Sequence, residues 1–219
     1  MTTNAKNVNI NYSLDPNLGY DYSLIDGCII FDRAVPVVGA DIKTFKQIAH
    51  NYAKDKNSVF YMDKKIEGAD IETFRVLGEG YAVDKNHAYV LGKLFRTMNV
   101  DLETLTPILA FLACYIKDKN IVFVGDEPIE GSDPDSFLVL ASGRYAKDKN
   151  HVYYLGTTIQ GADIESFVAL ESTSTSIYIQ IDECAKDKNR FYYKGEPTSE
   201  EEVKRFIDEE QKRMKKYEI

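Results

Sequence analysis

The sequence predicts a mostly β protein with short helices (α+β), arranged as a tandem array of six β-hairpin and short-helix repeats with a C-terminal capping helix. Three observations support this fold class. The tripeptide Asp-Lys-Asn recurs five times in 219 residues. The chain contains 15 Tyr and 11 Phe but no Trp, and Tyr and Phe favour strands. Residues 198–219 have the polar and apolar spacing of an amphipathic helix.

The repeats are defined by an aspartate that begins each copy of the tripeptide. These aspartates are Asp55, Asp84, Asp118, Asp148 and Asp187, and a degenerate copy, "DGC", begins at Asp26. The spacings are 29, 29, 34, 30 and 39 residues. We therefore expect residues 1–21 to form a polar N-terminal extension, residues 22–197 to form six repeats and residues 198–219 to form the capping helix.

The residues around each tripeptide predict a β-hairpin. An aromatic residue follows the aspartate by five positions in every copy, at Phe31, Phe60, Tyr89, Phe123, Tyr153 and Tyr192. A tyrosine precedes it by three positions in four copies, at Tyr52, Tyr81, Tyr115 and Tyr145. In such a turn Asp bonds to its own backbone and Asn tolerates a positive φ. We expect the two sets of aromatic side chains to face each other across the hairpin.

The second half of each repeat predicts a short helix followed by a strand. "GAD" ends at Asp41, Asp70 and Asp163, with variants that end at Asp101 and Asp133. Aspartate is a good helix N-cap, and the residue four positions later is expected to face inward. These inward residues are Phe45, Phe74, Leu105, Phe137 and Phe167.

The C-terminus predicts a helix that closes the array. Ser199 and Glu202 form the pattern of a capping box. The apolar stripe consists of Val203, Phe206, Ile207, Met214 and Tyr217. Acidic residues lie at its start and basic residues at its end, which suits the helix dipole.

Repeats of the form "DKNxVYY" followed by "GADxxSF" resemble the bacterial DKNYY family. The resemblance covers roughly Tyr22 to Pro197. The first repeat ("IDGCIIFD") and the variants "VDLETL" and "GSDPDSF" depart from the pattern. The resemblance implies a repeat domain of uncharacterised function and gives no catalytic residues to carry over.

Composition excludes several kinds of partner. The net charge is −8 and the basic residues are not clustered, so we expect no binding to nucleic acid. The longest apolar run, residues 107–116, is too short to span a bilayer. The first residues contain no apolar core of a signal peptide, so we expect a cytoplasmic protein without membrane insertion.

Three cysteines without CxxC spacing indicate neither a disulfide framework nor a zinc site, and Cys28 and Cys114 are expected to be buried.

The sequence does not predict an enzyme, a metal site or a cofactor. His87 and His151 share a repeat position that elsewhere holds Ser58, Ile121 or Arg190, so no catalytic group can be assembled around it. The tripeptide contains the Asp-x-Asn of calcium loops, but the further oxygen ligands are missing and its lysine opposes a cation.

Candidate partner-binding residues lie where the repeats depart from their pattern. The longest spacing contains the insertion "ESTSTSIYIQIDECA", and insertions in repeat arrays are often located on the binding face. Acidic residues at loop tips are the other candidates, since they suit a basic partner. The candidate residues are Ser172, Thr173, Ser174, Thr175, Tyr178, Asp182, Glu183, Asp126 and Glu127.

The predicted function is non-enzymatic protein binding. Its most concrete form is a cytoplasmic bacterial immunity protein that binds and inhibits a toxin domain, which would be basic. One alternative is a structural or surface-associated repeat scaffold. The other is a small-ligand or carbohydrate-binding domain with tyrosine-lined grooves between repeats.

Overall fold

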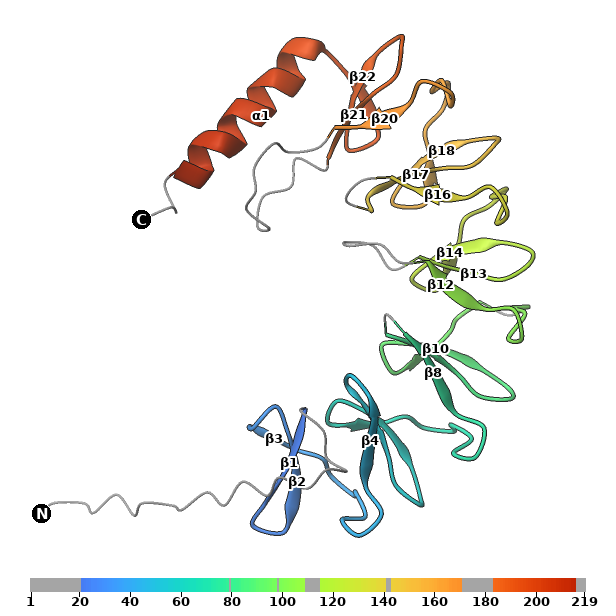
Figure 1. The fold of residues 1–219 in the computed structure, drawn as a ribbon, viewed down its shortest axis with the longest axis vertical. Helices are drawn as coiled ribbons and strands as arrows, with labels where there is room; N and C mark the ends of the chain where they lie inside the picture. Colours follow the sequence, from blue (N-terminus) through green and yellow to red (C-terminus); the bar gives the residue numbers. More distant parts are fainter. Residues whose placement is uncertain are drawn as a thin grey trace, which may run out of the picture. The chain divides into compact units, whose positions relative to one another are not determined.

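The computed structural model describes residues 21–78, 80–97, 99–108, 115–140, 143–170 and 183–215. These residues form six small antiparallel sheets and one helix (Figure 1). The chain divides into two compact units, Met1–Phe95 and Arg96–Ile219. The mostly β prediction and the C-terminal helix are therefore confirmed.

Every sheet is made of strands that follow one another in the chain. The first unit contains β1 (Tyr22–Ile25), β2 (Cys28–Phe31) and β3 (Val35–Pro36); β4 (Lys46–Ala49), β5 (Tyr52–Lys54), β6 (Val59–Tyr61) and β7 (Lys64–Lys65); and β8 (Arg75–Gly78), β9 (Tyr81–Val83), β10 (Ala88–Val90) and β11 (Lys93–Leu94). The second unit contains β12 (Thr106–Ile108), β13 (Tyr115–Lys117), β14 (Val122–Val124) and β15 (Glu127–Pro128); β16 (Leu138–Val139), β17 (Tyr145–Lys147), β18 (Val152–Tyr154) and β19 (Thr157–Thr158); and β20 (Val168–Ala169), β21 (Cys184–Lys186), β22 (Phe191–Tyr193) and β23 (Glu196–Thr198), followed by α1 (Glu200–Lys215).

The segment after "GAD" forms a hydrogen-bonded turn and not a helix. In the turn at Asp41, the N–H groups of Thr44 and Phe45 donate to the Asp41 carbonyl at 3.1 and 2.9 Å. The chain then enters β4, so no second helical turn forms. The prediction of a short helix in every repeat is wrong, because the strand that must pair with β5 begins one residue after Phe45. The inward position of the residue after the turn is confirmed, since Phe45 is buried.

The Asp-Lys-Asn tripeptide forms the predicted hairpin loop, between the second and third strands of five sheets. Lys54 pairs with Val59, which leaves a four-residue loop in which Asp55 N–H donates to the Ser58 carbonyl at 2.9 Å. The expectation that the Asn has a positive φ is wrong, because Asn57 and its equivalents do not adopt one.

Positive φ angles occur in the next connection of the sheet, where two residues join the third and fourth strands. Consecutive residues with positive φ are Leu91 and Gly92, Leu155 and Gly156, and Lys194 and Gly195. This is the geometry of the primed two-residue turn, which matches the twist of a hairpin.

The aromatic side chains of one hairpin face different neighbours and not each other. The register pairs Tyr52 with Tyr61 and Ala53 with Phe60. Tyr52 and Phe60 therefore project from opposite faces of the sheet, because neighbouring residues of a strand alternate. The prediction that the two sets of aromatic side chains face each other is therefore wrong, because the strand register differs by one residue from the expected one.

Each aromatic position instead completes a cluster between consecutive sheets of one unit. The phenylalanine after the "GAD" turn lies between a tyrosine of the preceding sheet and an aromatic residue of its own sheet. Ring centroids are 5.1–5.9 Å apart in these clusters. The clusters are Tyr22–Phe45–Phe60, Tyr52–Phe74–Tyr89, Tyr115–Phe137–Tyr153 and Tyr145–Phe167–Tyr192. Each aromatic pair contributes roughly 0.5–1.5 kcal/mol beyond its buried area.

Polar bonds join the same sheets at the end of the tyrosine side chain. The Tyr145 hydroxyl donates to the Glu183 carbonyl at 2.8 Å and accepts from Gly195 N–H at 3.1 Å. Tyr52 makes the same two bonds with Gly80 and Gly92. Because these carbonyl and N–H groups belong to turns of the following sheet, each tyrosine fixes how two sheets stack.

The first repeat is offset by one residue from the predicted alignment. Tyr22 pairs with Phe31 and Ile25 with Cys28, around a two-residue turn at Asp26 and Gly27. Phe31 therefore corresponds to Tyr61, and Ile25 takes the place of the repeat aspartate. This sheet has three strands in the described part of the chain.

The helix α1 packs on the last sheet, against β22 (Figure 1). Val203 is buried against Cys184, and the rings of Phe206 and Tyr193 stack at 4.1 Å. Ser199 Oγ accepts from Glu202 N–H at 3.1 Å, which is the predicted N-cap bond. The Met214 side chain and Tyr217 lie outside the described residues.

We expect Gly195→Ala to destabilise the chain by roughly 2–4 kcal/mol, the sum of left-handed strain and overpacking. Gly195 has a φ of 81°, and an added Cβ would lie 2.8 Å from Tyr154 Cβ of the preceding sheet. Urea unfolding followed by tyrosine fluorescence measures the change, since the chain has no Trp.

The matched control is Gly125→Ala, which has a φ of 63° but open space around the added Cβ. We expect it to cost only the backbone strain, about 1–2 kcal/mol. Equal losses in the two variants would contradict close packing between the sheets.

Candidate functional site

The buried aspartate of each tripeptide is the centre of a network of hydrogen bonds. Asp148 Oδ1 accepts from the N–H groups of Asn150 and His151, both at 2.7 Å. Its Oδ2 accepts from Asp133 N–H at 2.8 Å and from the Tyr153 hydroxyl at 2.7 Å. The carboxylate therefore receives four hydrogen bonds in a buried position.

A second, more exposed aspartate closes the same network. Asp133 Oδ1 accepts from Ser136 N–H and Oγ–H at 2.9 and 2.6 Å, and its Oδ2 contacts Lys149 Nζ at 2.6 Å. Ser136 Oγ in turn accepts from Lys149 N–H at 3.1 Å. These bonds join the "GAD" turn to the following tripeptide, although the strands β16 and β17 separate the two segments in the chain.

The network occurs five times, and four of these copies have nearly the same distances. Its members are Asp55, Asp41, Lys56 and Thr44; Asp84, Asp70, Lys85 and Thr73; Asp118, Asp101, Lys119 and Thr104; Asp148, Asp133, Lys149 and Ser136; and Asp187, Asp163, Lys188 and Ser166. In the copy at Asp55 the bond from Asp41 N–H is shorter, at 2.6 Å. A tyrosine hydroxyl joins the three copies at Asp84, Asp148 and Asp187.

These contacts stabilise both aspartates in the ionised form. Burial alone would raise the pKa of Asp148, but the hydrogen bonds from Asp133, Tyr153, Asn150 and His151 outweigh it and lower that pKa. The ammonium group of Lys149, with the Ser136 hydroxyl and N–H, lowers the pKa of Asp133 to about 2. At this site the hydrogen bonds to the charged carboxylate thus lower the pKa by more than desolvation raises it.

The arrangement is suited to holding two segments of the chain together. Each buried carboxylate already accepts its hydrogen bonds, and a lysine ammonium group occupies the place where a cation would lie. In the part of the chain that the structure describes, no three His, Cys, Asp or Glu side chains are arranged to hold a metal ion.

The histidines lie at the edge of this network. The Nδ1 atoms of His87 and His151 are 3.6 and 4.0 Å from Oδ1 of Asp84 and Asp148, and both side chains are partly exposed. His50 Nδ1 lies 3.1 Å from Asp21 Oδ2. The sequence did not indicate this contact, because Asp21 directly precedes β1 of the neighbouring sheet.

The cysteines differ in exposure. Cys28 is exposed, so its predicted burial is wrong, and Cys114 lies outside the described residues. Cys28 precedes β2 core residue Ile29 by one position and therefore projects from the other face of the strand. Burial raises the pKa of the Cys184 thiol to about 11, which disfavours the nucleophilic thiolate.

The tyrosines provide the core and not an open aromatic surface. All described tyrosines are buried or half-buried, and seven of them are fully buried. A carbohydrate site needs exposed aromatic faces. In the described residues the tyrosine hydroxyl groups instead bond to turns and to the repeat aspartates.

Almost all differences in repeat length fall at one end of the sheets. The connection between the first and second strands spans 50–51, 79–80, 109–114, 140–144 and 170–183 in successive four-stranded sheets. The loop between the second and third strands always has four residues, as in 148–151. Since connections alternate between ends in an antiparallel sheet, the variable loops and the constant loops lie at opposite ends. We call the first end the insertion end and the other the tripeptide end.

The predicted binding residues that the structure describes, Asp126, Glu127 and Glu183, lie at the insertion end of the second unit and form ion pairs within the chain. Asp126 and Glu127 accept from Arg96, whose Nε and Nη2 lie 2.6 and 2.5 Å from the two carboxylates. Glu183 is 3.6 Å from Arg144 and 3.4 Å from Lys194. The other candidates, Ser172, Thr173, Ser174, Thr175, Tyr178 and Asp182, lie outside the described residues.

The sequence analysis missed these basic partners. Arg144 and Glu183 each come four residues before the aspartate of consecutive repeats. Because equivalent positions of neighbouring sheets adjoin, opposite charges there predict an ion pair between repeats. Arg96 lies in the segment that precedes its sheet, where the repeat pattern gives no comparable signal.

Comparison with known proteins supports the repeat assignment. A family model described as the DKNYY family matches residues 3–93 and 115–206. The match begins before Tyr22 and ends within α1, so it is longer than the resemblance seen in the repeats alone. No curated protein and no solved structure matched the chain.

We expect Asp148→Asn to destabilise the chain by roughly 1–3 kcal/mol at pH 7, because the amide nitrogen would face a donor that the carboxylate now accepts. The pKa of Asp148 is lowered in the folded chain. Its stabilisation is therefore complete above the unfolded pKa of about 3.9 and is lost as the pH falls through the lower folded value.

Urea midpoints at pH 7 and pH 3.5 measure both effects. The variant should lose less stability on acidification than the natural chain, since one of the titrating carboxylates is gone. Asp135→Asn is the control, because it also removes one carboxylate but Asp135 is exposed and reaches the network only through the attraction of its charge to Lys149. A pH dependence unchanged by Asp148→Asn would contradict the role of this carboxylate.

Proposed function

The chain belongs to the DKNYY family, and on that premise we propose that it is a non-enzymatic repeat protein that binds another protein through its insertion end. The five buried aspartate networks are structural in this proposal. They make the tripeptide end the rigid side of the repeats and leave the other end open to variation. Rigid sheets that present variable loops are a common platform for recognition.

The observation that carries the proposal is the unequal distribution of loop lengths. Tripeptide loops are constant, and the segments 37–45, 66–74, 129–137 and 159–167 that precede the sheets have nine residues each, whereas the equivalent segment 95–105 has eleven. The connection 170–183 is much longer than its equivalent 50–51. The connections differ by up to twelve residues at the insertion end and by two at the tripeptide end. Neutral drift would lengthen loops similarly at both ends, so the unequal variation favours binding at the insertion end.

Charge favours a basic partner for the second unit. Residues 1–95 contain 11 Lys and Arg against 12 Asp and Glu, a net charge of −1. Residues 96–219 contain 16 against 23, a net charge of −7. Long-range attraction of a basic surface to this unit would increase the association rate.

A basic toxin domain is the partner that best combines these properties, with the chain acting as its cytoplasmic bacterial immunity protein. Inhibition requires only that the bound loops cover a cleft of the toxin. It requires no catalytic residue, metal or cofactor in this chain, in keeping with the paired state of its carboxylates.

The test is capture of a tagged chain from its native cells, with the products of adjacent genes as candidate partners, followed by affinity measurement with the purified partner. We expect a stoichiometric protein partner. Cutting the 170–183 connection to the two-residue length of 50–51 should weaken its binding at least about tenfold, or 1.4 kcal/mol, without changing the urea midpoint.

The matched control changes charge at the tripeptide end. Glu103, Asp135 and Glu165 are exposed there at equivalent positions, and no described residue forms an ion pair with them. A variant with Glu103→Gln, Asp135→Asn and Glu165→Gln should retain binding within about threefold. Loss of binding in this control but not in the shortened variant would place the surface at the wrong end. Recovery of the chain alone would overturn the proposed function.

A further inference from the structure

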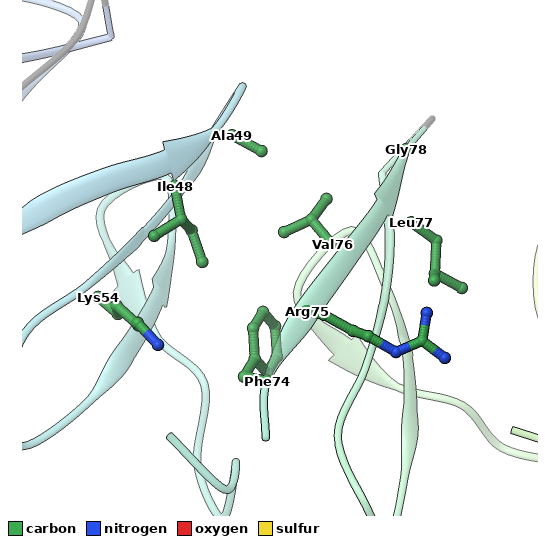
Figure 2. Close-up of a pocket in the computed structure, with 8 residues that line it drawn as sticks. All are labelled: Ile48, Ala49, Lys54, Phe74, Arg75, Val76, Leu77 and Gly78. Atoms are coloured by element: carbon green, nitrogen blue, oxygen red, sulfur yellow. The ribbon is translucent and has the colours of Figure 1, made fainter. Parts of the chain in front are cut away.

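A hollow of about 350 Å³ lies between two consecutive sheets of the first unit, at their insertion end. Its floor is formed by Tyr52 and Tyr61, whose rings meet edge to face with centroids 4.9 Å apart. Leu91, which is 50 % exposed, forms one wall. The hollow adjoins the space between β4 and β8, where Figure 2 shows Ile48 and Val76 pointing toward each other. Most of its surface is therefore apolar.

The stacking of sheets alone does not produce this hollow. Three of its lining positions recur, counted from the tripeptide aspartate, between the last two sheets of the second unit. They hold Asn51, Gly80 and Leu91 in the first unit and Arg144, Glu183 and Lys194 in the second. In the second unit the Glu183 carboxylate lies 3.6 Å from Arg144 and 3.4 Å from Lys194, so ion-paired side chains occupy this place. In the first unit uncharged residues, one of them a glycine, leave it open.

His50 lines the rim of the hollow and is held in one orientation. Its side chain is 82 % exposed, and its Nδ1 lies 3.1 Å from Asp21 Oδ2. The same oxygen accepts from Asn51 N–H at 2.8 Å, so the backbone fixes the carboxylate. Because an ionised carboxylate only accepts hydrogen bonds, His50 Nδ1 carries a proton. The neutral ring therefore presents Nε2 as an acceptor.

The hollow thus combines apolar walls with one oriented hydrogen-bond acceptor. Its described lining residues include no Lys, Arg, Asp or Glu, so a charged ligand would find no partner there. An aromatic ring with a single donor matches this composition. The indole of tryptophan is such a ring, because its N–H only donates and its rings bury a large apolar area. The chain contains no Trp, so the indole must come from another molecule.

We propose that this hollow binds the indole ring of a tryptophan of the protein partner, with the indole N–H donating to His50 Nε2 and the ring packed against Leu91 and Val76. The site lies at the insertion end, and tryptophan is among the residues that contribute most to the affinity of protein interfaces. The inference rests on the proposed function in one respect only, that the tryptophan belongs to a partner protein.

The probe is N-acetyl-L-tryptophanamide, titrated at pH 8 into the full ¹⁵N-labelled chain. The comparison is its 1-methylindole analogue, which lacks the N–H donor. We expect saturable amide shifts at Ala49, Gly78 and Leu91, which line the hollow. The methylated probe should bind at least about threefold more weakly, because it cannot form the hydrogen bond to His50. The absence of saturable shifts at these residues overturns the proposal.

His50→Phe keeps a ring at the rim but removes the acceptor. It should abolish the difference between the two probes and leave binding of the methylated probe unchanged. The urea midpoint should not change, since the His50 side chain is 82 % exposed. His87→Phe, at the tripeptide end, is the matched control and should keep the difference. A preference for the unmethylated probe that survives His50→Phe contradicts the assigned acceptor.

Leu91→Lys tests the apolar wall without a new backbone strain. Leu91 has a φ of 49°, and Lys194 holds the equivalent position with a φ of 51°. The change should weaken binding of the probe at least about threefold, because a charged group replaces apolar surface that the indole would cover. Leu155→Lys is the matched control, in the same turn of another sheet with a φ of 45°. Equal affinities of the two variants for the probe would overturn the site.

Three further outcomes separate this proposal from the proposed function. A captured partner, together with a probe that does not bind, overturns the hollow site alone. Probe binding without any captured partner overturns the proposed function and keeps the hollow as an aromatic site. Probe binding that Leu91→Lys weakens, with an unchanged affinity for the captured partner, assigns the hollow to a free aromatic molecule and overturns the partner's tryptophan.

Discussion

The buried carboxylate of each tripeptide is the constraint on which the repeat depends. One oxygen of Asp148 fixes its own turn, and the other holds the N–H of Asp133 at the start of the preceding segment. That segment ends in Phe137, whose ring lies between Tyr115 of the neighbouring sheet and Tyr153 of its own. Turn chemistry therefore determines where the aromatic ring enters the interface. An incomplete set of donors would leave a buried charge, so the network and the stacking must form together.

Because this network fixes only one end of each sheet, the other end can change without loss of the core. At the insertion end the bonds that join sheets come from tyrosine hydroxyl groups to backbone atoms, such as Tyr145 to the Glu183 carbonyl. A backbone acceptor is supplied by any residue type, so side chains and loop lengths there are free to diverge. The tripeptide end requires specific Asp, Lys and Ser or Thr side chains, and its segments differ by two residues at most.

Local chemistry in the sequence predicted the repeat, the turn, the inward phenylalanine and the C-terminal helix, because each depends on residues close together in the chain. Relations between repeats were not predicted. Tyr52 and Phe60 were expected to meet, but a register that differs by one residue sends them to opposite faces, and periodic spacing alone does not fix this parity. The positive φ expected at the tripeptide Asn appears instead at Leu155 and its equivalents. At the candidate site, Glu183 was predicted to suit a basic partner protein, but its pairing with Arg144 and Lys194 was not predicted, because these two residues flank other strands.

The two units share the aspartate networks and differ in segments that the networks do not fix. The aspartate networks are present in both units, so the framework does not distinguish them. What differs lies away from the networks: the long 170–183 connection and the charge of −7 in the second unit, against −1 in the first. The first position of the edge strand also varies, because Lys46 and Arg75 of the first unit correspond to Thr106, Leu138 and Val168 of the second. Positions that no network residue contacts therefore change in charge and in length, while the five buried carboxylates keep the same partners in both units.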